Sequence, residues 1–408
     1  MRGRLWGFLW GCGLLSGWLW GCVGPEDSHW RGKQAVSTDA ELDRLQQALE
    51  AHASAATAFQ LGQAYRRRGQ WTQAAQSYQR ALGIDPQHIE SLFAMAELCL
   101  QMQFKKEAVP WIQRIEQLAP EKASVQRRCG FLYEAAQEHR RAEAAWRKAL
   151  ALDPADAESQ KGLVFLLAAQ DRWEEARQVA EKGRNAAAYR LLGRALLAKR
   201  RPAEALAQFQ EALRLAPDSA EAYLDCADAW VACNDLEAAH NSLRQAQRLA
   251  PRSAAPWVKR GLLYEKQQRW EEAVSAYRAA LERDPEEPVA ANNLAYHYVS
   301  HGENLEEALR LAQLAYRKLP RNAHIRDTLA LAYQALGQTE KARSLLEPLT
   351  QEFPKEAQFH YHLALVYRRL NRLQAARASA QRALALDDQF PEAAQCRAFL
   401  RQMGLSPR

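Results

Sequence analysis

Cysteine is scarce in this chain: seven occur in 408 residues, and five of them lie beyond residue 23. These five are odd in number and irregularly spaced, which does not indicate a disulfide framework; they are Cys99, Cys129, Cys226, Cys233 and Cys396. In the repeat pattern described below, Cys129 and Cys226 take a position normally held by Leu, and Cys99 takes the Tyr position. We therefore expect small, buried side chains. Cys99 and Cys129 would lie on neighbouring helices, so a disulfide between them stays open in an oxidising compartment.

Sequence motifs of catalysis and metal binding are also missing. The chain has no glycine-rich phosphate loop, no G-x-S-x-G elbow and no paired C-x-x-C. His297 and His301 have helical spacing but lack the glutamate that a zinc protease places after its first histidine. His360 and His362 would point to different sides of a helix. The sequence therefore predicts no enzyme, and it assigns no cofactor, metal or small-molecule substrate.

Charge is not gathered into one patch. The formal net charge is +7, yet Arg and Lys mostly alternate with Glu and Asp along the chain. Short basic runs at 66–68 and 199–201 fall at the ends of predicted helices, where cations interact favourably with the helix dipole. Because no basic face is concentrated, we expect no nucleic-acid partner.

No linker interrupts the composition from about residue 40 to the end, which favours one elongated array over separate globules. The chain has 48% hydrophobic and 25% charged residues, as folded proteins do. Ala, Leu, Gln, Arg and Glu are frequent, and all of them are good helix formers. The sequence therefore predicts an all-α fold.

The N-terminal segment, from Met1 to Val23, differs from the rest of the chain. Two arginines precede an uncharged stretch over residues 5–23 with four tryptophans and five glycines, which is typical of a secretory signal. The run L-W-G-C at 19–22 resembles a bacterial lipoprotein cleavage box, although Trp20 stands where a small residue is usual. The resemblance implies lipidation of Cys22, and Val23 after it points by family analogy to the outer membrane. An uncleaved signal anchor, ordinary secretion and a misassigned start are the alternatives.

Prolines recur at a nearly fixed interval. They stand at positions 86, 120, 154, 217, 251, 285, 320 and 354, and Asp388 takes the next place. Most successive prolines in this series are separated by the same number of residues as Pro86 and Pro120. The interval from Pro154 to Pro217 is longer and divides into one full unit and one shortened unit. We therefore expect a shortened fourth repeat at about 157–185, a second helix ending near Gly183, and a local change of curvature.

Apolar positions repeat between the prolines and resemble the tetratricopeptide repeat family. The first unit matches the family's L-G, Y, A, F, A, P spacing through Leu61, Gly62, Tyr65, Ala74, Tyr78, Ala81 and Pro86. The fifth unit repeats it with Leu192, Gly193, Leu196, Ala205, Phe209, Ala212 and Pro217, and the seventh with Trp257, Gly261, Tyr264, Ala273, Tyr277, Ala280 and Pro285. Small residues let two antiparallel helices approach, and each pair is stable only when it stacks on its neighbours.

The resemblance implies an α-α superhelix of about ten helix-turn-helix repeats with a capping helix at each end. The expected organisation is a signal at 1–22, a tether at 23–37, an N-terminal capping helix at 38–54, repeats one to four at 55–185, repeats five to ten at 186–390 and a C-terminal capping helix at 391–408. Thr38 to Glu41 reads as a capping box at the start of the first of these helices.

In this family the first helix of each repeat lines the concave surface, so residues that flank its core positions are candidates for partner contact. One group is aromatic: Phe59, Phe93, Phe131 and Phe165. A second group is basic: Arg66, Arg127, Lys161, Arg190 and Arg194. A segment with apolar anchors and acidic residues would complement them. Alternatively, close curvature or the capping helix buries the phenylalanines.

The function that these features favour is a protein-interaction scaffold that binds other proteins or peptide segments. The lipoprotein resemblance places it in the bacterial cell envelope, lipid-anchored on the periplasmic side and at the outer membrane rather than the inner. Similar repeat lipoproteins serve pilus assembly, outer-membrane biogenesis and export. The alternative is a soluble regulatory adaptor without a lipid anchor.

Overall fold

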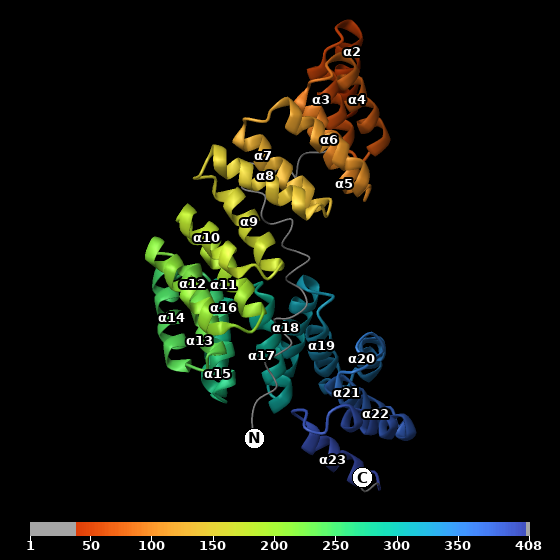
Figure 1. The fold of residues 1–408 in the computed structure, drawn as a ribbon. Helices are drawn as coiled ribbons and strands as arrows, with labels where there is room; N and C mark the ends of the chain where they lie inside the picture. The colour runs from red at the N-terminus through yellow and green to blue at the C-terminus, as the bar shows by residue number, and fades with distance from the viewer. Residues whose placement is uncertain (1–37, 405–408) are drawn as a thin grey trace. The chain divides into compact units, whose positions relative to one another are not determined.

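The structure is a computed structural model that describes residues 38–404, and Figure 1 shows its helices along the chain. Within these residues there are 22 α-helices and no strands. Ten consecutive helix-turn-helix pairs, α3 to α22, lie between one single helix at each end. The predicted all-α solenoid of about ten repeats with two capping helices is confirmed. The predicted signal at 1–22, the tether at 23–37 and Cys22 lie outside the described residues.

The helices divide between two compact units. Residues 38–217 hold α2 (Asp39–Ala51), α3 (Ala55–Arg67), α4 (Trp71–Ile84), α5 (Ile89–Gln101), α6 (Lys105–Leu118), α7 (Ala123–Ala135), α8 (His139–Leu152), α9 (Ala157–Ala169), α10 (Trp173–Gly183), α11 (Ala186–Ala198) and α12 (Pro202–Leu215). Residues 218–404 hold α13 (Ala220–Ala232), α14 (Leu236–Leu249), α15 (Ala255–Lys266), α16 (Trp270–Arg283), α17 (Pro288–His301), α18 (Leu305–Lys318), α19 (Ala323–Ala335), α20 (Thr339–Glu352), α21 (Ala357–Arg369), α22 (Leu373–Leu386) and α23 (Ala393–Gln402).

The repeated prolines lie in the turns between repeats. α4 ends at Ile84, the N–H of Asp85 donates to the carbonyl of Ala81 at 2.8 Å, and Pro86 follows in the turn before α5. The other seven prolines and Asp388 occupy the equivalent turns. A proline is unfavourable in a helix interior, so the eight repeats that carry it end at the same place.

A left-handed residue lies in the turn between the two helices of each repeat. Glycine fills this position in three repeats, at Gly69, Gly302 and Gly337. The other seven repeats place a larger residue there with φ between 58° and 66°, at Gln103, Gln137, Asp171, Arg200, Asn234, Gln268 and Asn371. Such a backbone costs roughly 1–2 kcal/mol for a residue with a side chain, so stacking of the helices must compensate for it.

A glycine facing an aromatic ring sets the close approach of the two helices in the odd-numbered repeats one to seven. A Cβ on Gly62 would lie 2.4 Å from the ring of Tyr78, and Gly193 and Gly261 stand equally close to Phe209 and Tyr277. These rings are buried and fill the space that the missing side chain leaves.

The third repeat carries the largest ring in this position, Trp146, which is 1% exposed. Gly130 of its own repeat approaches one side, where a Cβ would lie 2.4 Å from Nε1. Gly162 of the following α9 approaches the other, where a Cβ would lie 2.7 Å from Cε2. The indole is therefore held between two glycines from successive repeats.

The fourth repeat is irregular. Its second helix, α10, has 11 residues and ends at Gly183, whereas the second helices of the other nine described repeats have 14. A Cβ on Gly183 would lie 2.2 Å from the amide carbon of Gln160, a buried residue that donates to the carbonyl of Pro154 at 2.7 Å. Arg184 then turns the chain with φ 45°, and α11 packs directly against α9.

The two end helices cap their units by burying apolar side chains. α2 buries Leu42, Leu45 and Leu49, and the Thr38 hydroxyl accepts from the N–H of Glu41 at 3.2 Å. α23 begins at Ala393 and buries Cys396 and Phe399. Among helices α2 to α23, none is both long and apolar enough to cross a lipid bilayer.

The packing of Trp146 between Gly130 and Gly162 leads to a prediction about stability. Gly162→Ala should lower the free energy of unfolding by about 1–3 kcal/mol, because the new Cβ must displace a buried indole. The matched control is Gly83→Ala in α4, where a Cβ would meet nothing within 4 Å and the helix gains about 0.5–1 kcal/mol. Urea unfolding followed by circular dichroism measures both. Equal effects of the two substitutions would contradict the packing described.

Candidate protein-binding surface

The nine predicted contact residues all lie on the first helices of repeats one to five, α3, α5, α7, α9 and α11. We call them the first-helix surface: Phe59, Arg66, Phe93, Arg127, Phe131, Lys161, Phe165, Arg190 and Arg194. All lie within residues 38–217, so the fold brings them onto successive stacked helices of one unit. Their role in partner binding stays a prediction, but the structure shows how accessible each one is.

The phenylalanines of this surface are less accessible than an open groove requires. Phe93 is 2% exposed, and the guanidinium carbon of Arg128 lies 3.8 Å from its ring centre. The expectation that Phe93 is an exposed contact is therefore wrong, because an arginine of the next repeat covers it. Phe59, Phe131 and Phe165 are half-buried. For Phe59 and Phe131 the neighbours include Tyr78 at 5.9 Å and Trp146 at 5.2 Å between ring centres.

Basic residues of the first-helix surface form ion pairs across repeats. Glu97 on α5 accepts from Arg66 of α3 at 3.0 Å and from Arg128 of α7 at 2.6 Å. The Glu97 side chain is only 7% exposed, so both pairs are shielded from water. Arg127 pairs with Asp156 at 3.4 Å, and Asp156 also caps α9. In repeats one to three the basic side chains therefore help to join repeats.

The composition of the first-helix surface changes where α11 packs against α9. α11 carries Arg190 and Arg194 one turn apart and contains no acidic residue. α9 contributes half-buried Phe165 and Lys161, the latter paired with Glu158 at 2.5 Å. The short α10 thus brings an aromatic and three cationic residues onto two helices in direct contact. This part of the first-helix surface combines the half-buried Phe165 with the cationic side chains of Lys161, Arg190 and Arg194.

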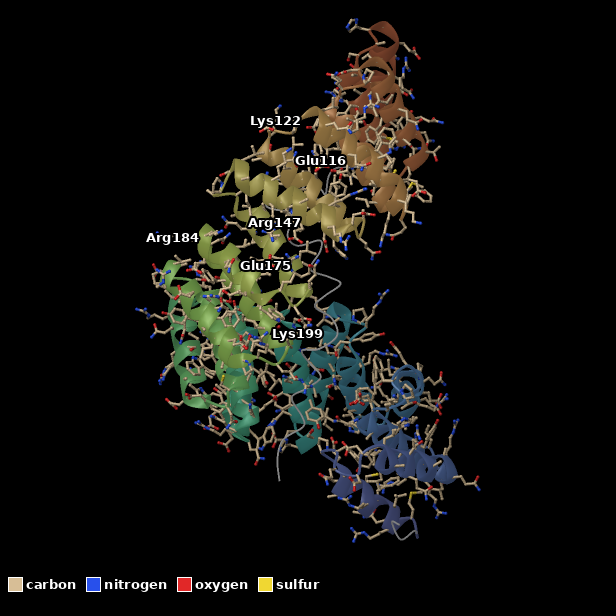
Figure 2. All side chains as sticks on the ribbon, in the orientation of Figure 1. Glu116, Lys122, Arg147, Glu175, Arg184 and Lys199 are labelled. Carbon is tan, nitrogen blue, oxygen red and sulfur yellow. The ribbon has the colours of Figure 1, made fainter. Side chains whose placement is uncertain are left out.

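Second helices carry a separate set of charges, which sequence reasoning did not single out. Figure 2 labels Arg147 on α8 and Glu175 on α10, whose side chains pair at 2.9 Å. Arg172 joins this pair through Glu143 at 2.7 Å and Glu175 at 2.7 Å. Hydrogen bonds from Arg172 lower the pKa of Glu143, so the carboxylate stays ionised. The network links α8 to α10 across the repeat boundary.

A hollow of about 490 Å³ lies beside the short α10. Its walls include the indole of Trp173 and the apolar side chains of Leu192 and Leu196. Arg201 stands 5.2 Å from the Trp173 ring and pairs with Glu204. The charges around the hollow are therefore largely balanced. An apolar side chain of a partner could contact the apolar part of its wall.

The cysteines follow the sequence expectation for the most part. Cys129 and Cys226 are buried, and burial raises the pKa of Cys226 to about 12. Cys99 is half-buried rather than buried. All five cysteines between residues 38 and 404 are free thiols in this structure, Cys99 and Cys129 among them.

Residues 218–404 contain a buried polar cluster that the sequence did not reveal. His362 on α21 bonds through Nδ1 to both carboxylate oxygens of Asp327 on α19, at 2.8 and 2.9 Å. Its Nε2 lies 3.6 Å from Glu392, the residue before α23. Glu392 also accepts from the hydroxyl of Tyr296 on α17 at 3.1 Å and from the amide of Gln358 at 3.1 Å. Four segments of the chain meet here.

The charges of this cluster stabilise one another. Burial opposes the charge on His362, but the carboxylates of Asp327 and Glu392 outweigh it and raise the pKa of His362 to about 10. Burial likewise opposes the charge on Glu392, yet hydrogen bonding to His362 keeps the pKa of Glu392 below its usual value. The imidazolium therefore sits between two carboxylates at neutral pH.

The other histidine positions fit local roles. His360 points away from the cluster, and its Nε2 donates to the carbonyl of Pro354 at 3.2 Å. His297 and His301 stack with ring centres 4.2 Å apart, and Nδ1 of His301 donates to the carbonyl of His297. Across the described part of the chain, no three His, Cys, Asp or Glu side chains are arranged to hold a metal ion.

Family models match three stretches of the chain. Residues 62–103 match a TPR repeat model, and residues 357–390 match a tetratricopeptide repeat model. Residues 180–361 match the Cilia and flagella-associated protein 70 C-terminal domain. A comparison with curated proteins finds no match. The matches support tetratricopeptide repeats, while the resemblance to bacterial lipoproteins stays a prediction.

Solved structures with similar folds cover most of the chain at low identity. The APC/C hetero-tetramer Cut9-Hcn1 has a TM-score of 0.47 at 13% identity, covering 89% of this chain and 92% of that one. Yeast Tom70 has a TM-score of 0.44 at 14% identity, covering 90% and 92%. The human IFIT1 dimer with m7Gppp-AAAA has a TM-score of 0.37 at 17% identity, covering 86% and 95%.

The His362 cluster predicts a pH dependence of stability. Because folding raises the pKa of His362 from 6.5 to about 10, its contribution is complete below pH 6.5 and is lost as the pH rises through 10. The stability difference between the wild type and His362→Gln should therefore shrink across this range. Urea unfolding at a series of pH values measures it.

The matched control is His360→Gln on the same helix. Burial lowers the pKa of His360, so this side chain is neutral in both the folded and unfolded states above pH 6.5. Its difference from the wild type should stay constant from pH 6.5 to 10. A His362→Gln difference that is equally constant would show that the imidazolium is not stabilised by its carboxylates.

Proposed function

We propose that this chain, a tetratricopeptide-repeat protein by its fold and its repeat matches, is a scaffold that binds protein segments while its N-terminus holds it at a membrane. Stacked repeats of this kind present a long, rigid surface built from many helices. The described residues offer two features for a partner, the first-helix surface and the hollow beside α10. Binding of other proteins is the role that such repeats support.

The partner site that we favour is the part of the first-helix surface on α9 and α11. The observation that carries it is the direct packing of α11 on α9, which places Phe165 and Lys161 on a helix adjoining the one that carries Arg190 and Arg194. Phe93 is covered by Arg128, whereas Phe165 is half-buried. A segment with an apolar anchor flanked by acidic residues complements this site.

The anchoring that we propose is lipidation of Cys22 in a bacterial envelope protein. The uncharged stretch before Cys22 and the L-W-G-C run support it, and Val23 supports the outer membrane. Several acyl chains on one cysteine would give stable attachment. A scaffold placed there would help to assemble or hold a multiprotein machine, such as one for pilus assembly, outer-membrane biogenesis or export.

A soluble regulatory adaptor without a lipid anchor is the second candidate. The match of residues 180–361 to a domain of a cilia- and flagella-associated protein favours it, because cilia are eukaryotic structures. In that case the segment from Met1 to Val23 is not a lipoprotein signal. The first-helix surface would serve the same kind of partner in either setting.

Analysis of the N-terminus separates the two candidates. We expect mass spectrometry of the mature protein to find a diacylglyceryl group on Cys22, and Cys22→Ser to move the protein out of the membrane fraction. The physical reason is that acyl chains supply the membrane affinity. An intact Met1 in a soluble fraction would instead establish the adaptor.

Partner capture tests the site on α9 and α11. Phe165→Ala combined with Arg194→Ala should weaken capture of the protein's partners from detergent extract by about tenfold or more, because central aromatic and arginine residues dominate interface energies. The control is Phe104→Ala, which removes an aromatic that is 49% exposed at the start of α6. Quantitative mass spectrometry of the captured proteins compares the variants. Unchanged capture with the folded double variant would rule out this site.

A further inference from the structure

Glu392 is bound much as a ligand carboxylate would be. Its Oε1 accepts from the Tyr296 hydroxyl at 3.1 Å and from the Gln358 amide at 3.1 Å, and His362 Nε2 lies 3.6 Å away. The three donors belong to α17 and α21, the first helices of repeats eight and ten. Asp327 holds the opposite nitrogen of His362, which fixes the ring with Nε2 toward the carboxylate.

The contact between Tyr296 and Glu392 joins residues 96 positions apart, from the eighth repeat to the segment after the tenth. In a repeat array each unit normally contacts only its neighbours, so stacking alone does not require this contact. The capping helix has its own attachment through Ala393, Cys396, Phe399 and Leu400, all of them buried in the C-terminal core. Release of Glu392 would therefore leave α23 attached.

The fit of Glu392 is incomplete. Its second oxygen, Oε2, is buried and has no hydrogen-bond partner. A buried acceptor without a donor is unfavourable, so Glu392 does not use the full capacity of a carboxylate. A competing carboxylate therefore has to displace a group that is bound through one oxygen only.

We propose that Tyr296, Gln358 and His362 form a carboxylate-binding site that Glu392 fills from within the chain, and that an acidic side chain of a bound protein replaces Glu392. The complementarity is chemical: two neutral donors and one imidazolium converge on a single oxygen. Glu392 then acts as an internal competitor that keeps the site closed until an Asp or Glu of the partner enters. This site lies in residues 218–404 and does not depend on the partner site on α9 and α11.

Chemical rescue with acetate tests this site in the full chain. Glu392→Ala should lower the Tm by roughly 4–8 °C, because it empties a buried and partly charged site. Sodium acetate should then raise the Tm of the variant saturably, whereas sodium chloride at the same ionic strength should not. Adding Tyr296→Phe should reduce the acetate effect, because one donor is lost. The wild type, whose site is filled, should respond equally to the two salts.

The matched control is Glu352→Ala, which removes a glutamate that is 53% exposed and pairs with Arg326. It should show no preference for acetate over chloride. Equal responses of Glu392→Ala to the two salts would overturn the proposal. If the variant does not fold in chloride, recovery of folded protein in acetate supports the site, and recovery in neither salt overturns it. Since acetate replaces any partner in this test, its failure leaves the scaffold function untouched.

Discussion

The distance between the two helices of a repeat is the constraint on which the rest of the structure depends. In the odd-numbered repeats one to seven, where the first helix has glycine at the position of Gly62, the residue 16 positions later on the second helix is an aromatic such as Tyr78. Where the first helix has alanine, as at Ala96, the partner is aliphatic, as at Ile112, and both are fully buried. A smaller residue on the first helix is thus matched by a larger one on the second, and the close packing of the two helices is kept.

Stacking of these pairs places charged side chains of successive first helices within reach of one another. Glu97 joins three repeats because arginines of the repeats before and after it both bond to its carboxylate. Charged side chains of the first helices therefore hold successive repeats together. α11, which packs on α9, itself carries no acidic residue.

The sequence predicted the repeats because proline spacing and small residues are local signals, and the same signals located the turns. It could not predict that Phe93 is covered, because Arg128 lies 35 positions further along and meets the ring only through stacking. The contact of Glu392 with Tyr296 depends in the same way on how several repeats curve together. The left-handed turn residues, such as Gln137, were also missed, because glutamine carries no turn signal.

The short α10 has a consequence for the periodicity that a partner meets. Three missing residues remove about 4.5 Å of helix, at 1.5 Å for each residue. α11 packs directly against α9, more closely than the earlier first helices of this unit pack on one another. We expect a ligand that runs along α3 to α11 to meet a different spacing at the last of these helices. Its own anchor residues must be unevenly spaced to match, so a perfectly periodic segment would lose register at the last helix.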